Sequence, residues 1–159
     1  MSLSHNKQIV QRVWNDLVNR GRLESLDELV SSEFRDHTPL PGQPDDLEGL
    51  MQRLMLLHGA FPDFHSTILD LTAEGDKVVA LIRSTGTHEQ PFLGEPPSGK
   101  RFTILEIHIM RLAGGKMVEH WGMPDFFGML AQLGLVSVPW GAEAAAAVAG
   151  PQMAGERHA

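Results

Sequence analysis

The sequence predicts an α+β fold in which helices cover one face of a curved antiparallel sheet and enclose a single pocket. Helical spacing of apolar residues is confined to the first 60 residues and to one late segment. Residues 64–122 instead carry the alternation and the β-branched content that are typical of strands. Helices gathered on one side of such a sheet define the α+β class, and the twist of long strands leaves a hollow against the helices.

Most of the expected helices lie at the N-terminal end of the chain. Residues 4–20 repeat apolar side chains every four positions, and Gly21 ends this helix. Residues 23–31 predict a second, short helix. A loop that is rich in proline follows, and residues 46–60 then predict a third helix with leucines along one face.

Strand patterns follow the third helix and are separated by glycine-containing turns. The strands are expected over residues 65–71, 77–88, 101–112 and 116–122. A late helix is expected over residues 124–134. We expect this domain to cover residues 1–136, and an Ala/Gly-rich tail to follow over residues 137–159, partly helical at residues 142–149.

Composition excludes several classes of function. The net charge of −7 at pH 7 argues against nucleic acid and against anionic lipid, because both need a basic surface. The absence of cysteine excludes disulfides, a thiolate nucleophile and thiolate-bound zinc. The N-terminal segment lacks the apolar core of a signal peptide, and no stretch reaches the roughly 20 apolar residues of a membrane span. We therefore expect a cytoplasmic protein with no nucleic-acid or membrane partner.

Residues suited to chemistry gather in the last β-hairpin. Alternation along its first strand puts Glu106 and His108 on the same face, in apolar surroundings. With a three-residue Ala-Gly-Gly loop, His120 lies opposite His108 and Gly122 lies opposite Glu106. This register is preferred, and it brings the carboxylate and the two imidazoles together on one patch of the sheet.

A second register remains open for this hairpin. A two-residue Gly-Gly turn would shift the pairing by one residue and put Trp121 beside His108, whereas the preferred register turns Trp121 to the opposite face. Neither face of strand 101–112 is plainly polar, so we expect both faces to be covered.

A carboxylate beside two imidazoles in a dry pocket is suited to acid–base catalysis. Histidine titrates near neutral pH, and a neighbouring carboxylate tunes its pKa. The competing interpretation is that these histidines are core or dimer-interface residues. Two histidines and a carboxylate also suit zinc or iron. The sequence offers no firm further ligand, so we expect neither a metal nor another cofactor.

Several segments of the sequence resemble one known family. They are Glu106-Ile107-His108-Ile109-Met110-Arg111, Gly115-Lys116-Met117-Val118-Glu119-His120, Pro124-Asp125-Phe126, Phe34-Arg35-Asp36-His37 and Phe61-Pro62-Asp63. Together they resemble the SnoaL-like family of polyketide and ester cyclases, which belongs to the NTF2-like superfamily. The resemblance runs from about residue 5 to residue 135.

The resemblance implies an NTF2-like (cystatin-like) cone with a deep pocket, assembled as a homodimer or a higher homo-oligomer. In the nogalamycin-type cyclases, an aspartate on the last strand removes a proton beside a carbonyl, and a polyketide ester closes a ring without cofactor or metal. The resemblance places Gly122 at that aspartate's position. It also matches His108 with a pocket histidine and puts Asp36 where those enzymes have an asparagine.

The candidate catalytic residues are therefore His108, His120, Glu106 and Asp36, with either histidine as the acid or base. Further residues are candidates for contact with the substrate: His37, His88, Trp14, Met110, Gly122 and Asp125. Asp125 also has the position of a helix cap. Trp14 also fits the buried stripe of the first helix.

The expected function is cofactor-free aldol-type cyclisation or isomerisation of a small apolar carbonyl compound. Because Gly122 cannot take a proton, two alternatives stay open. One is hydrolysis of an epoxide or an ester by a water that Asp36 and a histidine hold. The other is a non-catalytic protein of the same fold that binds a small molecule.

Overall fold

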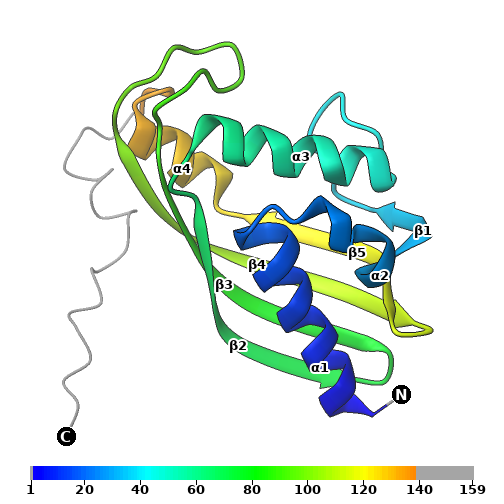
Figure 1. Ribbon diagram of the computed structural model, residues 1–159. Helices are drawn as coiled ribbons and strands as arrows, with labels where there is room; N and C mark the ends of the chain where they lie inside the picture. Colours follow the sequence, from blue (N-terminus) through cyan, green and yellow to red (C-terminus); the bar gives the residue numbers. More distant parts are fainter. Residues whose placement is uncertain (1, 139–159) are drawn as a thin grey trace, which may run out of the picture.

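The computed structural model describes residues 2–138, which form helices packed on one face of a long, twisted sheet (Figure 1). The α+β prediction is therefore confirmed. The tail expected over residues 137–159 lies almost entirely outside the described residues, as does its expected helix at residues 142–149.

Five strands form a single sheet in the order β1-β5-β4-β3-β2. They are β1 (Val30–Asp36), β2 (His65–Glu74), β3 (Lys77–Thr87), β4 (Arg101–Ala113) and β5 (Lys116–Pro124). Strands β2 to β5 pair antiparallel with their neighbours, whereas β1 pairs with β5 in parallel. Figure 1 shows β2, β3 and β4 curving together beneath the helices.

The helices begin and end at residues with clear local reasons. α1 (Leu3–Arg12) starts after Ser2, and it continues into a π-helical segment, η1 (Val13–Asn19), so the single helix predicted over residues 4–20 changes its hydrogen-bond pattern midway. A 3-10 turn, η2 (Leu23–Ser25), leads into the short α2 (Leu26–Leu29). Asp46 and Asp125 cap the N-termini of α3 (Leu47–Ala60) and α4 (Phe126–Leu133).

Strand β1 is the element that the sequence did not predict. The expected second helix ends early, and Val30 already begins an extended segment that runs to Asp36. Its pairing with β5 is interrupted between Val30 and Arg35, so its side chains do not alternate regularly between buried and exposed. Without that alternation the sequence gives no strand signal. The consequence is functional, because β1 places Asp36 directly beside His120.

The β4–β5 register differs from both registers considered above. A two-residue turn at Gly114-Gly115 pairs Ala113 with Lys116, and both glycines adopt the positive φ that such a turn requires. A β-bulge beside Arg111 then adds one further residue to β5, and His108 pairs with Gly122.

The predicted pairing of His108 with His120 is therefore wrong by two residues. Side chains alternate with a period of two, so a shift of two returns each of them to its original face. His120 still shares a face with His108, and Trp121 still points to the other side. The side chains of His108 and His120 therefore meet on one face of the sheet as predicted, although the predicted residue pairing is wrong.

The core consists of two clusters of buried side chains along the sheet. One lies beneath α1, η1 and α2 and includes Val10, Leu17 and Met110. The other lies near α4 and includes Phe61, Phe102 and Met129. Members of both clusters line the cavity described below.

The outer face of the sheet is exposed in the single chain, contrary to the expectation that both faces of β4 are covered. Leu105 is 55% exposed and Ile107 is 51% exposed. Leu81 pairs with Ile107 across β3 and β4 and is also exposed. This face carries a band of apolar side chains that no element of the described chain covers.

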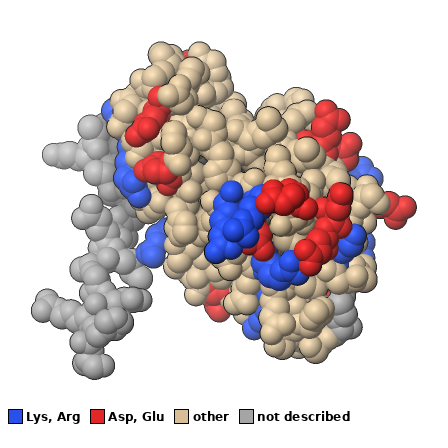
Figure 2. All heavy atoms as spheres, in the orientation of Figure 1, with Lys and Arg blue, Asp and Glu red and all other residues tan. Residues whose placement is uncertain are grey.

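Charges of both signs lie side by side over α1, η1 and α2 (Figure 2). Arg12 pairs with Glu28, and Arg20 and Arg22 both approach Asp16. Among residues 2–138, the helices are all too short or too polar to cross a membrane.

Candidate functional site

A cavity of about 350 Å³ lies between the sheet and the helices. Most of its wall is apolar and comes from helices η1, α3 and α4 and from strands β4 and β5. Its polar side chains gather in a few places and include Thr38, Arg53, Ser66, Glu106, His108 and His120. An apolar cavity with a few converging polar groups is the usual form of a small-molecule site.

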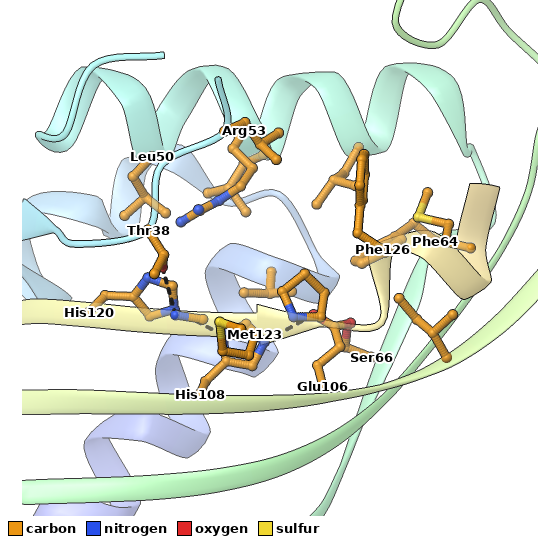
Figure 3. A pocket seen from close by; sticks show the side chains of 18 of the residues that line it. Thr38, Leu50, Arg53, Phe64, Ser66, Glu106, His108, His120, Met123 and Phe126 are labelled. Atoms are coloured by element: carbon orange, nitrogen blue, oxygen red, sulfur yellow. Dashed lines mark hydrogen bonds and ion pairs between the residues drawn. The ribbon is translucent and has the colours of Figure 1, made fainter. Parts of the chain in front are cut away.

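Four titratable side chains form a hydrogen-bonded chain that begins at the cavity wall. Figure 3 labels three of them, Glu106, His108 and His120, on the sheet side of the cavity. The Oε2 atom of Glu106 lies 2.9 Å from Nε2 of His108. The Nδ1 atom of His108 lies 2.9 Å from Nε2 of His120, and Nδ1 of His120 lies 3.0 Å from Oδ1 of Asp36. The chain thus crosses three neighbouring strands, from β4 through β5 to β1.

Strand geometry explains why these groups meet. Glu106 and His108 are two residues apart on β4, so both point towards the helices. His120 reaches the same face from β5, and Asp36 is its direct neighbour on β1. The His37 N–H donates a 2.8 Å hydrogen bond to the His120 carbonyl and fixes the end of β1 against β5.

Asp36 is the buried end of the chain, with a side chain that is only 3% exposed. Arg53, from α3, lies 2.8 Å from its second oxygen, and the Thr38 backbone N–H donates a 3.0 Å hydrogen bond to the first. Burial alone would raise the pKa of Asp36. The hydrogen bond from His120 and the positive charge of Arg53 nevertheless hold that pKa well below its usual range. Asp36 is therefore ionised at neutral pH.

The two groups next in the chain are also shifted. Burial lowers the pKa of His120 to about 4, although Asp36 opposes this shift. Burial would raise the pKa of Glu106, but its hydrogen bond to His108 and the charge of that ring lower it on balance. Near neutral pH the site therefore holds two carboxylates and a neutral His120.

Gly122 provides the space in which the two imidazoles meet. A Cβ atom at this position would lie 2.9 Å from Nδ1 of His108 and 2.9 Å from Cε1 of His120. Both contacts are shorter than those that real Cβ atoms make, so a side chain at position 122 would displace at least one of the rings. The Gly122 N–H donates a 2.7 Å hydrogen bond to the Thr38 hydroxyl, which ties β5 to the loop after β1.

Comparison with known proteins identifies the family. A sequence model of the SnoaL-like polyketide cyclases matches residues 8–133. This chain belongs to the SnoaL-like polyketide cyclase family. It is 29% identical over 125 residues to the nogalonic acid methyl ester cyclase of Streptomyces nogalater, which covers 77% of this chain and 90% of that protein. It is 28% identical to the aklanonic acid methyl ester cyclase DnrD of Streptomyces peucetius, with 77% and 84% covered.

Solved structures agree with this assignment. TsrD from Streptomyces laurentii superposes with a TM-score of 0.77 at 29% identity, over 86% of this chain and 99% of that chain. The predicted NTF2-like cone is therefore confirmed as the fold of this SnoaL-like protein. Gly122, which the resemblance placed at the position of the family's catalytic aspartate, lies at the cavity wall.

Two of the residues expected to contact substrate do line the cavity. They are Gly122 and Trp14, whose ring packs edge-on against His108 with 5.1 Å between ring centroids. Trp14 is also buried in the core, so both of its expected roles are compatible with its position.

The other four expected contacts lie away from the cavity wall. His37 stacks on Trp121 with 4.3 Å between centroids, because it directly follows Asp36 and alternation turns its side chain to the opposite face of the sheet. Met110 is fully buried in the core, and His88 is fully buried beside Ser98 with its Nδ1 3.1 Å from the serine hydroxyl. Asp125 accepts a 2.9 Å hydrogen bond from the Gly128 N–H and so caps α4. None of these four side chains belongs to the lining of this cavity.

Arg53 and Thr38 are functional candidates that the sequence interpretation missed. Arg53 lies on the apolar stripe of α3, one helical turn from Leu50 and from Leu57. A lone charge on an apolar stripe is a signal that could have been used. The Thr38 hydroxyl and backbone N–H both donate to Oδ1 of Asp36, two residues earlier. This is a local turn of a kind that aspartate commonly forms.

The sequence left two histidines and a carboxylate as possible metal ligands, and their geometry can now be compared with that of a metal site. Within residues 2–138, no three histidine, aspartate or glutamate side chains are arranged to hold a metal ion. The facing ring nitrogens of His108 and His120 are at hydrogen-bond distance from each other.

Proposed function

We propose that this SnoaL-like protein is an enzyme that removes a proton beside a carbonyl of an apolar substrate and so closes a ring. The observation that carries the proposal is the chain of two carboxylates and two imidazoles beside an apolar cavity. Such a chain can accept and return one proton, and the apolar walls exclude the water that would compete for the intermediate.

The proposed reaction is an intramolecular aldol closure. A base takes the proton from a carbon next to a carbonyl, and the electron pair of that C–H bond becomes an enolate. The enolate carbon forms a bond to a second carbonyl carbon of the same molecule, and the resulting alkoxide oxygen takes the proton back. Substrate and product are isomers, so the reaction calls for no oxidant, reductant or cofactor.

The relatives suggest the class of substrate. Two of them are named as cyclases of acid methyl esters, those of nogalonic and aklanonic acid. We extend that class to this chain and propose an apolar, ester-bearing polyketide with at least two carbonyl groups. A cavity of about 350 Å³ is within the usual range for a small-molecule site and matches a compact substrate better than a polymer.

The test uses nogalonic acid methyl ester and aklanonic acid methyl ester as probes, followed by liquid chromatography and mass spectrometry in water enriched in oxygen-18. A cyclase gives a product of unchanged mass and new retention time. His108→Ala should lower turnover without unfolding the protein, because it breaks the chain at its centre.

Other outcomes separate the competing functions. Uptake of oxygen-18 would indicate hydrolysis instead of cyclisation. Retention of a probe without conversion, seen by native mass spectrometry, would indicate a binding protein. Either result would overturn the proposed cyclase activity.

A further inference from the structure

We propose that Glu106 is the catalytic base, and that His108, His120 and Asp36 are positioning residues that keep it ionised and oriented. The proton-transfer step in this inference rests on the proposed function. The distribution of protons on which it depends does not, and it can be measured on the protein alone.

The hydrogen-bonded chain determines how many protons its four members hold. Three hydrogen bonds in series join Glu106, His108, His120 and Asp36, and each of them needs one proton. Two ionised carboxylates can only accept, so all three protons lie on the imidazoles. Two neutral imidazoles carry only two protons, and they would leave two lone pairs facing each other at 2.9 Å. The pair of rings therefore holds one extra proton and one positive charge.

The extra proton belongs on His108. His120 is only 5% exposed, and burial disfavours its charged form. It therefore accepts at Nε2 from His108 and donates at Nδ1 to Asp36. His108 then donates from both ring nitrogens, to His120 and to Glu106.

This arrangement alternates charges across the site. Arg53 is positive, Asp36 is negative, His108 is positive and Glu106 is negative, so the charges sum to zero. A buried set of charges is tolerated when each one is paired and hydrogen-bonded. Arg53 is thus the counter-charge that makes the three-proton state neutral.

The count leaves neither imidazole free to act as a base. All four ring nitrogens of His108 and His120 already donate or accept within the chain. Asp36 has both oxygens engaged and does not line the cavity. Glu106 lines the cavity; His108 donates to its Oε2 atom, and Ser84 is a second hydrogen-bond partner of this carboxylate. An ionised carboxylate has roughly four lone-pair sites, so these two partners leave Glu106 with acceptor capacity to spare. It is the member of this chain that has a lone pair available to a substrate.

The reacting step follows from that geometry. A free lone pair of Glu106 takes the proton from the substrate carbon, and the negative charge passes from the carboxylate to the enolate oxygen. His108 keeps its positive charge throughout, so it faces the enolate once Glu106 is neutral. Stabilisation of a developing negative charge by a fixed, partly desolvated cation is a major source of rate enhancement. Glu106 then returns the proton to the alkoxide formed by ring closure.

The proton count is tested by nitrogen-15 NMR of the histidine rings at neutral pH. We expect His108 to show both nitrogens protonated and His120 to show a neutral ring with the proton on Nδ1. Spectra of His108→Gln and His120→Gln assign the signals. Two neutral rings in the native protein would overturn the inference, whether or not any ester is converted.

The role of Glu106 is tested with the same methyl ester probes. Glu106→Gln keeps an oxygen that accepts from His108 but cannot take a proton, so we expect kcat to fall by about 10²-fold or more. Glu106→Asp should restore part of that loss. Glu119→Gln makes the same change on the neighbouring strand, where Glu119 pairs with Arg111 away from the cavity wall, and it should leave kcat unchanged.

The pH profile separates a base from a structural role. The electrostatic field at Glu106 is set by His108 beside it and by Arg53 from α3. His120 and Asp36 act on it through His108. His108→Gln removes a positive charge there, so the pKa of Glu106 rises and the acid limb of the kcat profile moves to higher pH. A Glu106→Gln enzyme that retains kcat while His108→Gln loses it would make histidine the base. If the ring signals show three protons but neither ester is converted, the proposed function fails and the catalytic role of Glu106 fails with it.

Discussion

Asp36 shows how a single buried carboxylate can make folding depend on pH. Its pKa in the folded protein is lower than its ordinary value of 3.8, because His120 and Arg53 stabilise the ionised form. A group with a lowered pKa contributes stability that is present above its unfolded pKa and is lost as the pH falls below it. As the pH falls, the unfolded state therefore binds a proton at this carboxylate that the folded state does not bind.

We expect Asp36→Asn to flatten the acid side of the stability curve. Between pH 7 and about pH 3, Asp36 should account for on the order of 1 kcal/mol of the free energy of unfolding that the native protein loses. Urea unfolding at both pH values measures this. Asp45→Asn is the matched control, because Asp45 forms an exposed pair with Arg35 that contributes little. Equal acid sensitivity in native protein and Asp36→Asn would contradict the ionised state of Asp36.

Gly122 is the residue whose size permits the contact between the imidazoles. In Gly122→Ala, the added methyl group would lie 2.9 Å from His108 and must displace one ring. We expect a loss of about 1–3 kcal/mol in stability, as in other overpacked sites, and a larger loss of turnover of the methyl ester probes. Thermal unfolding and kcat measure the two effects.

Gly59→Ala is the control for this change. Gly59 lies in α3, and a Cβ there has no neighbour within 4 Å. Alanine also favours a helix over glycine by about 1 kcal/mol. Gly59→Ala should therefore be neutral or stabilising, and equal losses in both variants would show that crowding at the imidazoles is not the cause.

At the scale of the elements, most of the fold could be predicted because most elements carry a regular pattern. The long strands β3 and β4 alternate over many residues, and α3 has a leucine face between a capping aspartate and a turn. β1 carries no such pattern, and its identity as a strand depends on contact with β5, which lies more than eighty residues later in the chain. Local sequence therefore could not place Asp36 beside His120.

The candidate site could be predicted where it depends on a regular strand pattern, and only there. Alternation was enough to put Glu106 and His108 on one face, and the hairpin brought His120 to them. The sequence could not predict which of these groups acts as the base and which ones position it, because those roles depend on which ring nitrogens and carboxylate oxygens are in contact. Arg53 was missed because its partner lies on an element that the pattern did not reveal.

Asp125, at the N-terminus of α4, has two candidate roles: it caps the helix, or it contacts the substrate. Its carboxylate accepts from the Gly128 N–H, as an N-cap does. We expect Asp125→Ala to cost about 1 kcal/mol of stability and Asp125→Ser to recover most of it, because serine also caps helices. Thermal unfolding measures the first effect. A raised KM for the methyl ester probes in Asp125→Ser, with stability restored, would instead support contact with the substrate.

At the scale of the whole molecule, the exposed outer face of the sheet supports the expected homodimer. Leu81, Leu105 and Ile107 form an apolar band on this face, and soluble monomers rarely leave large apolar patches uncovered. We propose that a second copy of the chain covers this face. The family resemblance points to the same assembly.

Ile107→Glu tests this assembly. We expect the native protein to sediment at twice its chain mass of 17.5 kDa and the variant to shift towards the monomer, because a buried carboxylate at the interface would be unpaired. Leu93→Glu is a control, since Leu93 is an exposed apolar residue on the loop after β3. A native monomer at micromolar concentration would contradict the proposal.

The bulge beside Arg111 has a consequence for how this hairpin can change in length. The short turn and the bulge each displace β5 by one residue, and together they keep His120 on the cavity side. At unchanged chain length, a ladder without the bulge would swap the two sides of the strand and present Trp121 to the ligand in place of the histidine. Deleting Val118, the residue that the bulge leaves unpaired, should instead remove the bulge and leave His120 on the cavity side, because Arg111 and Glu119 stay opposite each other.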